Sequence, residues 1–77
     1  MNELVTRTLD LKGLSCPLPI VKTAKAMKEL ESGDLVEVFA TDPGSVPDFA
    51  AWSKATGHEL VEQTQDASVF RFLLRKR

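Results

Sequence analysis

Apolar and polar positions divide the chain into six patterned segments, which are separated by short runs of turn-forming residues. The segments with the alternating or β-branched pattern typical of strands are residues 6–11, 35–41, 59–64 and 69–75. The segments with apolar positions near the helical repeat are residues 17–31 and 46–56. Gly33 and Gly57 follow these helical segments and are suited to end them, because glycine readily takes positive φ. The pattern predicts the element order β-α-β-α-β-β.

This order indicates an α/β fold, a two-layer sandwich in which a four-stranded mixed sheet has two helices on one face. Both helices are expected on the same side because crossover connections are right-handed. We also expect Ser45 to cap the second helix in a capping box with Asp48, three residues further on. The apolar positions expected between helices and sheet are Leu9, Leu11, Ile20, Val21, Ala24, Met27, Leu30, Val36, Val38, Ala40, Phe70, Phe72 and Leu74.

Length and charge fit one small domain over residues 1–77, with a core near the lower limit of self-sufficiency. The 10 basic and 11 acidic side chains give a net charge of −1, which does not favour a nucleic-acid coat or a membrane-binding surface. The sequence has no apolar run that could span a bilayer and no signal-peptide core. We therefore expect a cytoplasmic protein, and one unpaired thiol suits a reducing compartment.

The only cysteine, Cys16, stands between the first predicted strand and the first predicted helix, next to Pro17 and Pro19. Pro17 suits the first helical position, and Pro19 still lies in the first turn, where a missing N–H does no harm. A thiol at a helix N-cap faces partial positive charge, so we expect the Cys16 pKa below its free value of about 8.5. The alternative is a small buried hydrophobe, although cysteine is not a favoured N-cap residue.

The residue inventory excludes several thiol chemistries. A dithiol oxidoreductase needs a second cysteine, and a zinc site needs more ligands than Cys16 and the single histidine, His58, can supply. We therefore expect no metal. A papain-like pair would need His58 as its base, which is the less favoured interpretation because a lone histidine in a solvated loop is common. The remaining chemistry is a thiolate that takes up a group and passes it on.

Residues 9–19, with the sequence LDLKGLSCPLP, resemble the signature of the TusA/SirA family of small sulfur-carrier proteins, a Cys-Pro-x-Pro motif after a Leu-Asp-x-x-Gly strand and turn. Three further segments match the family in the same order: ATDPGS at 40–45, GHEL at 57–60 and FRFLLRK at 70–76. The resemblance covers nearly the whole chain, and it implies the same two-layer α/β fold.

The resemblance also implies a function, that of a sulfur carrier with little independent turnover. Cys16 would accept sulfane sulfur as a persulfide from a donor protein, a cysteine desulfurase or a rhodanese-like protein, and pass it to an acceptor sulfurtransferase. The sulfur would serve tRNA thiolation, cofactor synthesis or sulfur metabolism. Gly13, Pro17 and Pro19 would be the supporting motif. No cofactor is expected apart from the covalent persulfide sulfur, since the donor enzyme performs the C–S cleavage. We expect a monomer when the protein is free.

Four residues outside the motif are candidates for partner binding. Lys22 and Lys25 could favour the thiolate and dock acidic partners, or they could form an ordinary solvated face. Asp42 ends the second strand, so parallel pairing of the first two strands would place it beside Cys16; its alternative is a plain turn role. Trp52 could be an interface anchor or part of the core edge.

Two other classes of function are kept as alternatives. One is a regulatory or adaptor module in which Cys16 is a redox-sensitive contact and no sulfur is moved. The other is an RNA-binding domain, because the fold resembles the C-terminal domain of translation initiation factor three and the chain ends in a basic tail. Near-neutral charge and the lack of an aromatic stacking platform count against RNA binding. The basic residues concerned are Arg71, Arg75, Lys76 and Arg77.

Overall fold

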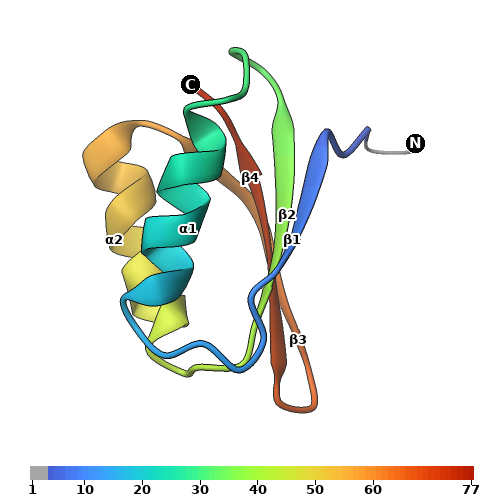
Figure 1. The fold of residues 1–77 in the computed structure, drawn as a ribbon, viewed down its shortest axis with the longest axis vertical. Helices are drawn as coiled ribbons and strands as arrows, with labels where there is room; N and C mark the ends of the chain where they lie inside the picture. The colour runs from blue at the N-terminus through green and yellow to red at the C-terminus, as the bar shows by residue number, and fades with distance from the viewer. Residues whose placement is uncertain (1–3) are drawn as a thin grey trace.

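A computed structural model describes residues 4–77, which form two layers (Figure 1). The elements are β1 (Arg7–Asp10), α1 (Leu18–Met27), β2 (Leu35–Ala40), α2 (Ser45–Thr56), β3 (Glu59–Asp66) and β4 (Val69–Arg75). Both helices lie on the same face of the sheet and run in the same direction (Figure 1). The predicted element order and the two-layer α/β sandwich are confirmed, and strand bounds differ from the predicted ones by at most two residues.

The sheet is mixed and has the order β1-β2-β4-β3. β1 pairs with β2 in parallel, with Leu9 opposite Val38, and β4 pairs antiparallel with both β2 and β3. Because β1 and β2 are parallel, their carboxyl ends meet at one end of the sheet. The loops that lead into α1 and α2 therefore lie together at the lower end of the molecule in Figure 1.

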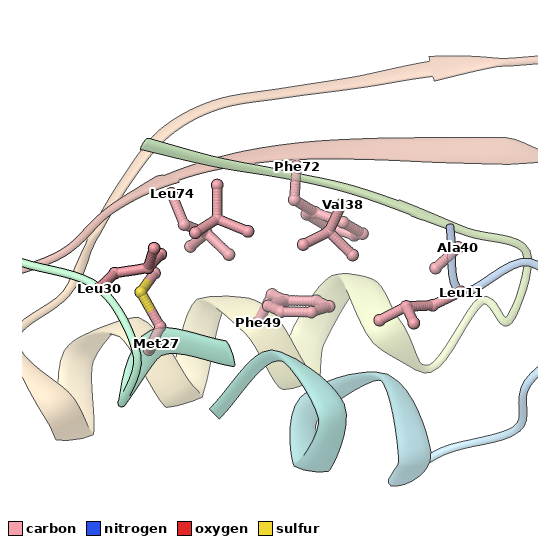
Figure 2. Packing of buried hydrophobic residues seen from close by; sticks show 9 residues of the cluster. Leu11, Met27, Leu30, Val38, Ala40, Phe49, Phe72 and Leu74 are labelled. Atoms are coloured by element: carbon pink, nitrogen blue, oxygen red, sulfur yellow. The ribbon is translucent and has the colours of Figure 1, made fainter. Parts of the chain in front are cut away.

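The core fills the space between the helices and the sheet, with Phe49 of α2 near its centre (Figure 2). The Phe49 ring lies against that of Phe72, with centroids 4.5 Å apart. Leu11 and Ala40 close the end of the core nearest the two helix-entry loops (Figure 2). Fully burying a side chain of this size stabilises the fold by roughly 1.5–3 kcal/mol. The cluster consists of Leu11, Met27, Leu30, Val36, Val38, Ala40, Phe49, Phe72 and Leu74.

The first helix is shorter than the sequence pattern predicts. It begins at Leu18, with Pro17 as its N-cap, and ends at Met27 instead of near residue 31. Beyond Met27 the backbone tightens, because the N–H groups of Glu29 and Leu30 donate to carbonyls three residues back. The shift at the start places Cys16 one residue before the N-cap, where it was expected to be the N-cap itself.

The buried face of α1 also differs from the predicted one. Val21 was expected to face the sheet, but it is 54% exposed, and Leu18 one turn earlier is 44% exposed. Pro19 and Thr23 are buried in their place. The Thr23 hydroxyl donates to the Pro19 carbonyl at 2.7 Å, so this buried polar group is satisfied within the helix. Two apolar side chains are consequently left on the surface near Cys16.

Candidate functional site

Cys16 is exposed and lies in the loop between β1 and α1. Gly13 turns the chain into this loop with a φ of +85°, which a side chain would disfavour. Its N–H donates to the Thr41 hydroxyl at 2.9 Å, and this bond ties the loop to the end of β2. Closer to the helix, the peptide bond between Cys16 and Pro17 is cis, and the Leu18 N–H donates to Ser15 at 2.9 Å. The bond to Thr41 therefore ties the start of the loop to β2, and the bond to Ser15 forms a turn at its end.

Asp42 lies directly beside Cys16, where the parallel pairing of β1 and β2 was expected to place it. Its Oδ2 accepts the Cys16 backbone N–H at 3.3 Å. Gly44 leaves space beside this bond, since a Cβ at position 44 would lie 2.9 Å from Asp42 Oδ2 and 3.6 Å from Cys16 Cβ. The two helix-entry loops thus contact each other at the cysteine.

Asp48 in the first turn of α2 contacts the sulfur itself: the Cys16 Sγ donates a hydrogen bond to Asp48 Oδ2. The capping box expected here was wrong. Gly44 is the N-cap and has no side chain to cap with, while the Ser45 hydroxyl donates to the Asp42 carbonyl at 2.6 Å. The Asp48 carboxylate consequently points to Cys16 instead of capping its own helix.

The acidic neighbours raise the pKa of the Cys16 thiol above its ordinary value. The hydrogen bond to Asp48 is the largest cause, followed by desolvation and by the charges of Asp48 and Asp42. Deprotonation would place a second negative charge against a carboxylate, which favours the thiol. The expected depression of the pKa was therefore wrong, because it considered the helix terminus and the lysines of α1 but no contact from α2.

Pro17 and Pro19 have different structural roles. Pro17 is the N-cap of α1 and is exposed, so it shapes the chain between the sulfur and the helix. Pro19 is buried at the helix start, and its carbonyl holds the Thr23 hydroxyl. Pro19 therefore lies on the buried side of the first turn of α1, whereas Pro17 stays on the surface.

Lys22 and Lys25 line a groove of about 230 Å³ between β1 and α1. Arg7 lies at the same groove and forms an ion pair with Glu29 at 2.6 Å. Neither lysine is among the charges that act on the Cys16 thiol, so the expected help to the thiolate is not observed. Lys28, the C-cap of the same helix, lines a different groove.

Trp52 is half-buried on the core edge. Its ring packs edge-on against Phe49, with centroids 6.1 Å apart, and lies 5.2 Å from the ring of His58. Trp52 also lines a groove of about 210 Å³ together with Met27 and Lys28. These contacts favour the core-edge alternative for Trp52.

His58 lies far from the cysteine along the helix layer. It follows the carboxyl end of α2, whereas Cys16 precedes the amino end of α1, and these are opposite ends of the layer (Figure 1). Its Nδ1 accepts the Arg77 N–H at 3.0 Å. Burial and the charges of Lys76 and Arg77 lower the His58 pKa. His58 is therefore not placed to act as a base for Cys16.

The basic tail is engaged within the chain. Arg71 contacts Glu37 at 2.6 Å and Glu62 at 2.5 Å, and Arg75 contacts Glu59 at 2.9 Å. The last two residues of the chain reach main-chain carbonyls with their side chains. The carboxylate partners offset the charges of Arg71 and Arg75, which counts against the RNA-binding alternative.

Two further properties concern the described residues as a whole. Within residues 4–77, no group of three or more His, Cys, Asp or Glu side chains is arranged to hold a metal ion. Neither helix in this range has the length and apolar character needed to cross a bilayer.

The fold and the site together define a small α/β protein that presents one exposed cysteine where two helix-entry loops meet. Comparison with known proteins identifies the family to which this protein belongs. Residues 7–76 match the family described as sulfurtransferase TusA, and the chain belongs to that family.

Individual relatives agree with this assignment. The chain is 54% identical over 70 residues to the putative sulfur carrier protein YrkI of Bacillus subtilis, covering 91% of this chain and 93% of the relative. It is 48% identical over 68 residues to the sulfur carrier protein TusA of Allochromatium vinosum, covering 88% and 90%. The crystal structure of a SirA-like protein from Desulfitobacterium hafniense superposes with a TM-score of 0.81 at 26% identity, covering 91% of this chain and 96% of that one. The family supports a role as a sulfur carrier.

Proposed function

We propose that this protein carries sulfane sulfur as a persulfide on Cys16, receiving it from one protein and passing it to another. The observation that supports the proposal most strongly is the placement of Cys16 in a member of this family. The thiol is exposed and is the only one in the chain. Two hydrogen bonds fix the loop that presents it, one from the Gly13 N–H to the Thr41 hydroxyl and one from the Cys16 N–H to the Asp42 carboxylate. A fixed and accessible sulfur is suited to meet the cysteine of a second protein.

The chemistry needs no cofactor on this chain. The Cys16 sulfur attacks the outer sulfur of a donor persulfide, an S–S bond forms, and the donor leaves as a thiolate that is then protonated. A thiol of the acceptor attacks the same sulfane sulfur in the next step, and Cys16 returns as a thiol. Each step exchanges one S–S bond for another, so no external oxidant or reductant is required. The C–S bond is broken earlier, on the donor enzyme.

The surface near Cys16 supports docking of a partner with acidic and apolar groups. Leu18 and Val21 are exposed on α1 directly after the cysteine. Lys22 and Lys25 line the neighbouring groove, and no residue in the described range forms an ion pair with them. A partner that buries the apolar pair and faces the lysines with carboxylates would bring its own cysteine to Cys16. Trp52, which packs on the core, lies outside this proposed surface.

The donor we propose is a cysteine desulfurase or a rhodanese-like protein in the cytoplasm, where a reducing environment keeps the single thiol unpaired. The acceptor is a sulfurtransferase in tRNA thiolation, cofactor synthesis or sulfur metabolism. The test is a relay with a pyridoxal-phosphate cysteine desulfurase and cysteine labelled with radioactive sulfur. Label should appear on the protein, be released by a thiol reductant, and pass to a low-molecular-weight thiol added after the donor is removed. Label that stays on the desulfurase would support the adaptor alternative instead.

A further inference from the structure

The contact between the Cys16 sulfur and Asp48 has a consequence for catalysis. We propose that Asp48 is a catalytic residue of sulfur loading: its carboxylate takes the proton of the Cys16 thiol as the sulfur attacks, and returns it to the leaving thiolate of the donor. The inference rests on the proposed function, because it assigns a role within the same transfer at Cys16.

The geometry gives Asp48 this role and gives Asp42 a different one. Cys16 Sγ donates to Asp48 Oδ2, whereas Asp42 Oδ2 accepts the backbone N–H of the same residue. Asp48 therefore contacts the group that must lose a proton, and Asp42 positions the peptide. A thiol whose S–H points to Asp48 also keeps its sulfur lone pairs directed away from that carboxylate. Since Cys16 is exposed, those lone pairs are accessible to an incoming persulfide.

Asp48 is held by a rigid part of the fold. It lies in the first turn of α2, and its backbone N–H donates to the Gly44 carbonyl at 3.2 Å. The next residue, Phe49, is fully buried and packs on Phe72. The carboxylate is thus positioned by a core-anchored helix, as a proton acceptor must be to keep its distance from the sulfur.

The charges around the sulfur make a proton acceptor necessary. The titratable groups that act on Cys16 are Asp48 from α2 and Asp42 from the loop before it, and both raise its pKa. The two nearby lysines of α1 do not act on the thiol. The free protein therefore holds Cys16 as a thiol at neutral pH, and a thiol is a poor nucleophile until a base removes its proton.

The step balances with glutathione persulfide as the donor. The Cys16 sulfur forms a bond to the outer sulfur of the donor, and the S–S bond of the donor breaks. The Cys16 proton passes to Asp48 Oδ2 and from there to the departing glutathione thiolate. The products are glutathione and a protonated persulfide on Cys16, and Asp48 is a carboxylate again.

The test compares two reactions of the same sulfur. Loading from glutathione persulfide is followed in single turnovers by intact mass, and alkylation by iodoacetamide is followed in parallel, both from pH 6 to pH 9. Alkylation reports the thiolate population, because it has no leaving thiolate that requires a proton. The variants are Asp48→Asn, which keeps the shape and removes the charge, Asp48→Glu, which keeps a carboxylate, and Asp42→Asn as the matched control beside Cys16.

Asp48→Asn should have opposite effects on the two reactions. Alkylation near neutral pH should become faster, because the carboxylate no longer disfavours the thiolate. Loading should become slower by about tenfold or more, in line with the size of general-base effects. Asp48→Glu should restore part of the loading rate. Asp42→Asn keeps an oxygen that can accept the Cys16 N–H but removes a charge that raises the Cys16 pKa, so alkylation and loading should become faster together, in contrast to Asp48→Asn.

The pH dependence of loading in the original protein gives a further test. Its loading rate, relative to that of Asp48→Asn, should be largest at low pH, where thiolate is scarcest. Loading that follows the alkylation titration in the original protein would overturn the role of Asp48, and so would an Asp48→Asn variant in which both rates rise together. A protein that gains no sulfur mass at any pH would overturn the proposed function as well, so the two failures are distinguishable.

Discussion

The Asp42 carboxylate accepts the backbone N–H of Cys16 at 3.3 Å, across 26 positions of sequence. The bond joins the loop before α1 to the loop before α2. The chain has a glycine two residues after the aspartate, and a Cβ on Gly44 would lie 2.9 Å from the accepting oxygen. The position of the cysteine loop is therefore linked to the conformation of the loop before α2.

Gly44→Ala should displace the Asp42 side chain and break its bond to the Cys16 N–H. Gly44 has a φ of −64°, which alanine adopts easily, and the crowded atom is the end of a flexible side chain. We expect a change in stability of no more than about 1 kcal/mol, but faster hydrogen exchange at the Cys16 amide. Amide exchange measured by NMR tests this. An unchanged Cys16 amide in a folded variant would show that Gly44 is not required for the contact.

Reversing the charges of Lys22 and Lys25 should slow sulfur transfer from a protein donor. The double change Lys22→Glu with Lys25→Glu alters the groove beside β1 and touches no residue of the core cluster. Stability should change by about 0.5 kcal/mol per site or less, whereas the association rate with an acidic donor should fall and lose its salt dependence. Stopped-flow transfer from a cysteine desulfurase at low and moderate salt measures both quantities.

The matched control is Lys28→Glu with Lys54→Glu, which makes the same change in net charge away from that groove. Lys28 lies in the groove beside Trp52, and Lys54 is in the last turn of α2. The control pair should slow the donor much less than the first pair. Equal slowing by the two pairs would mean that overall charge, and not the groove between β1 and α1, controls the encounter.

The protein should lose stability as the pH falls below about 6.5, and His58 should be one cause. Its pKa is lowered in the folded state, first by burial and then by Lys76 and Arg77. As the pH falls through the unfolded value of about 6.5, the unfolded chain binds a proton that the folded protein does not, so folding becomes less favourable. Above that pH, His58 is neutral in both states and adds no pH dependence.

Thermal unfolding of the original protein and of His58→Gln, measured from pH 7.5 to pH 5.5, checks this sign. The unfolding midpoint temperature should fall less in His58→Gln than in the original protein between pH 7.5 and pH 5.5. A decline as steep in His58→Gln as in the original protein would assign the acid sensitivity to the carboxylates.

The fold could be read from the sequence because its signals are local and repeated. Alternation at Leu9 and Leu11, the β-branched run through Val36 and Val38, and the glycine after each helical segment define elements that agree with the structure. The inward face of α1 was harder to predict. Val21 looks like a core residue by hydropathy, and only the packing of Pro19 and Thr23 shows that the helix is rotated away from it.

The site could be read only in part. The motif places Cys16, and parallel strands place Asp42 near it, but Asp48 looked like the last residue of a capping box begun by Ser45. An aspartate three residues after a serine can cap its own helix or contact a thiol 32 positions away, and the local sequence does not distinguish the two cases. The pKa argument failed for the same reason, because a helix terminus is a local feature and the contact from α2 is not.

The central claim, that Cys16 is the residue that holds sulfur, is tested most directly by intact mass with peptide mapping after exposure to a cysteine desulfurase and cysteine. The original protein should gain the mass of one sulfur atom, removable by a thiol reductant and located on the peptide that contains Cys16. Cys16→Ser should fold, because serine is nearly the same size and its hydroxyl can also donate to Asp48, and it should gain no sulfur. Added sulfur on a folded Cys16→Ser variant, or none on the original protein under conditions in which the desulfurase is loaded, would contradict the account.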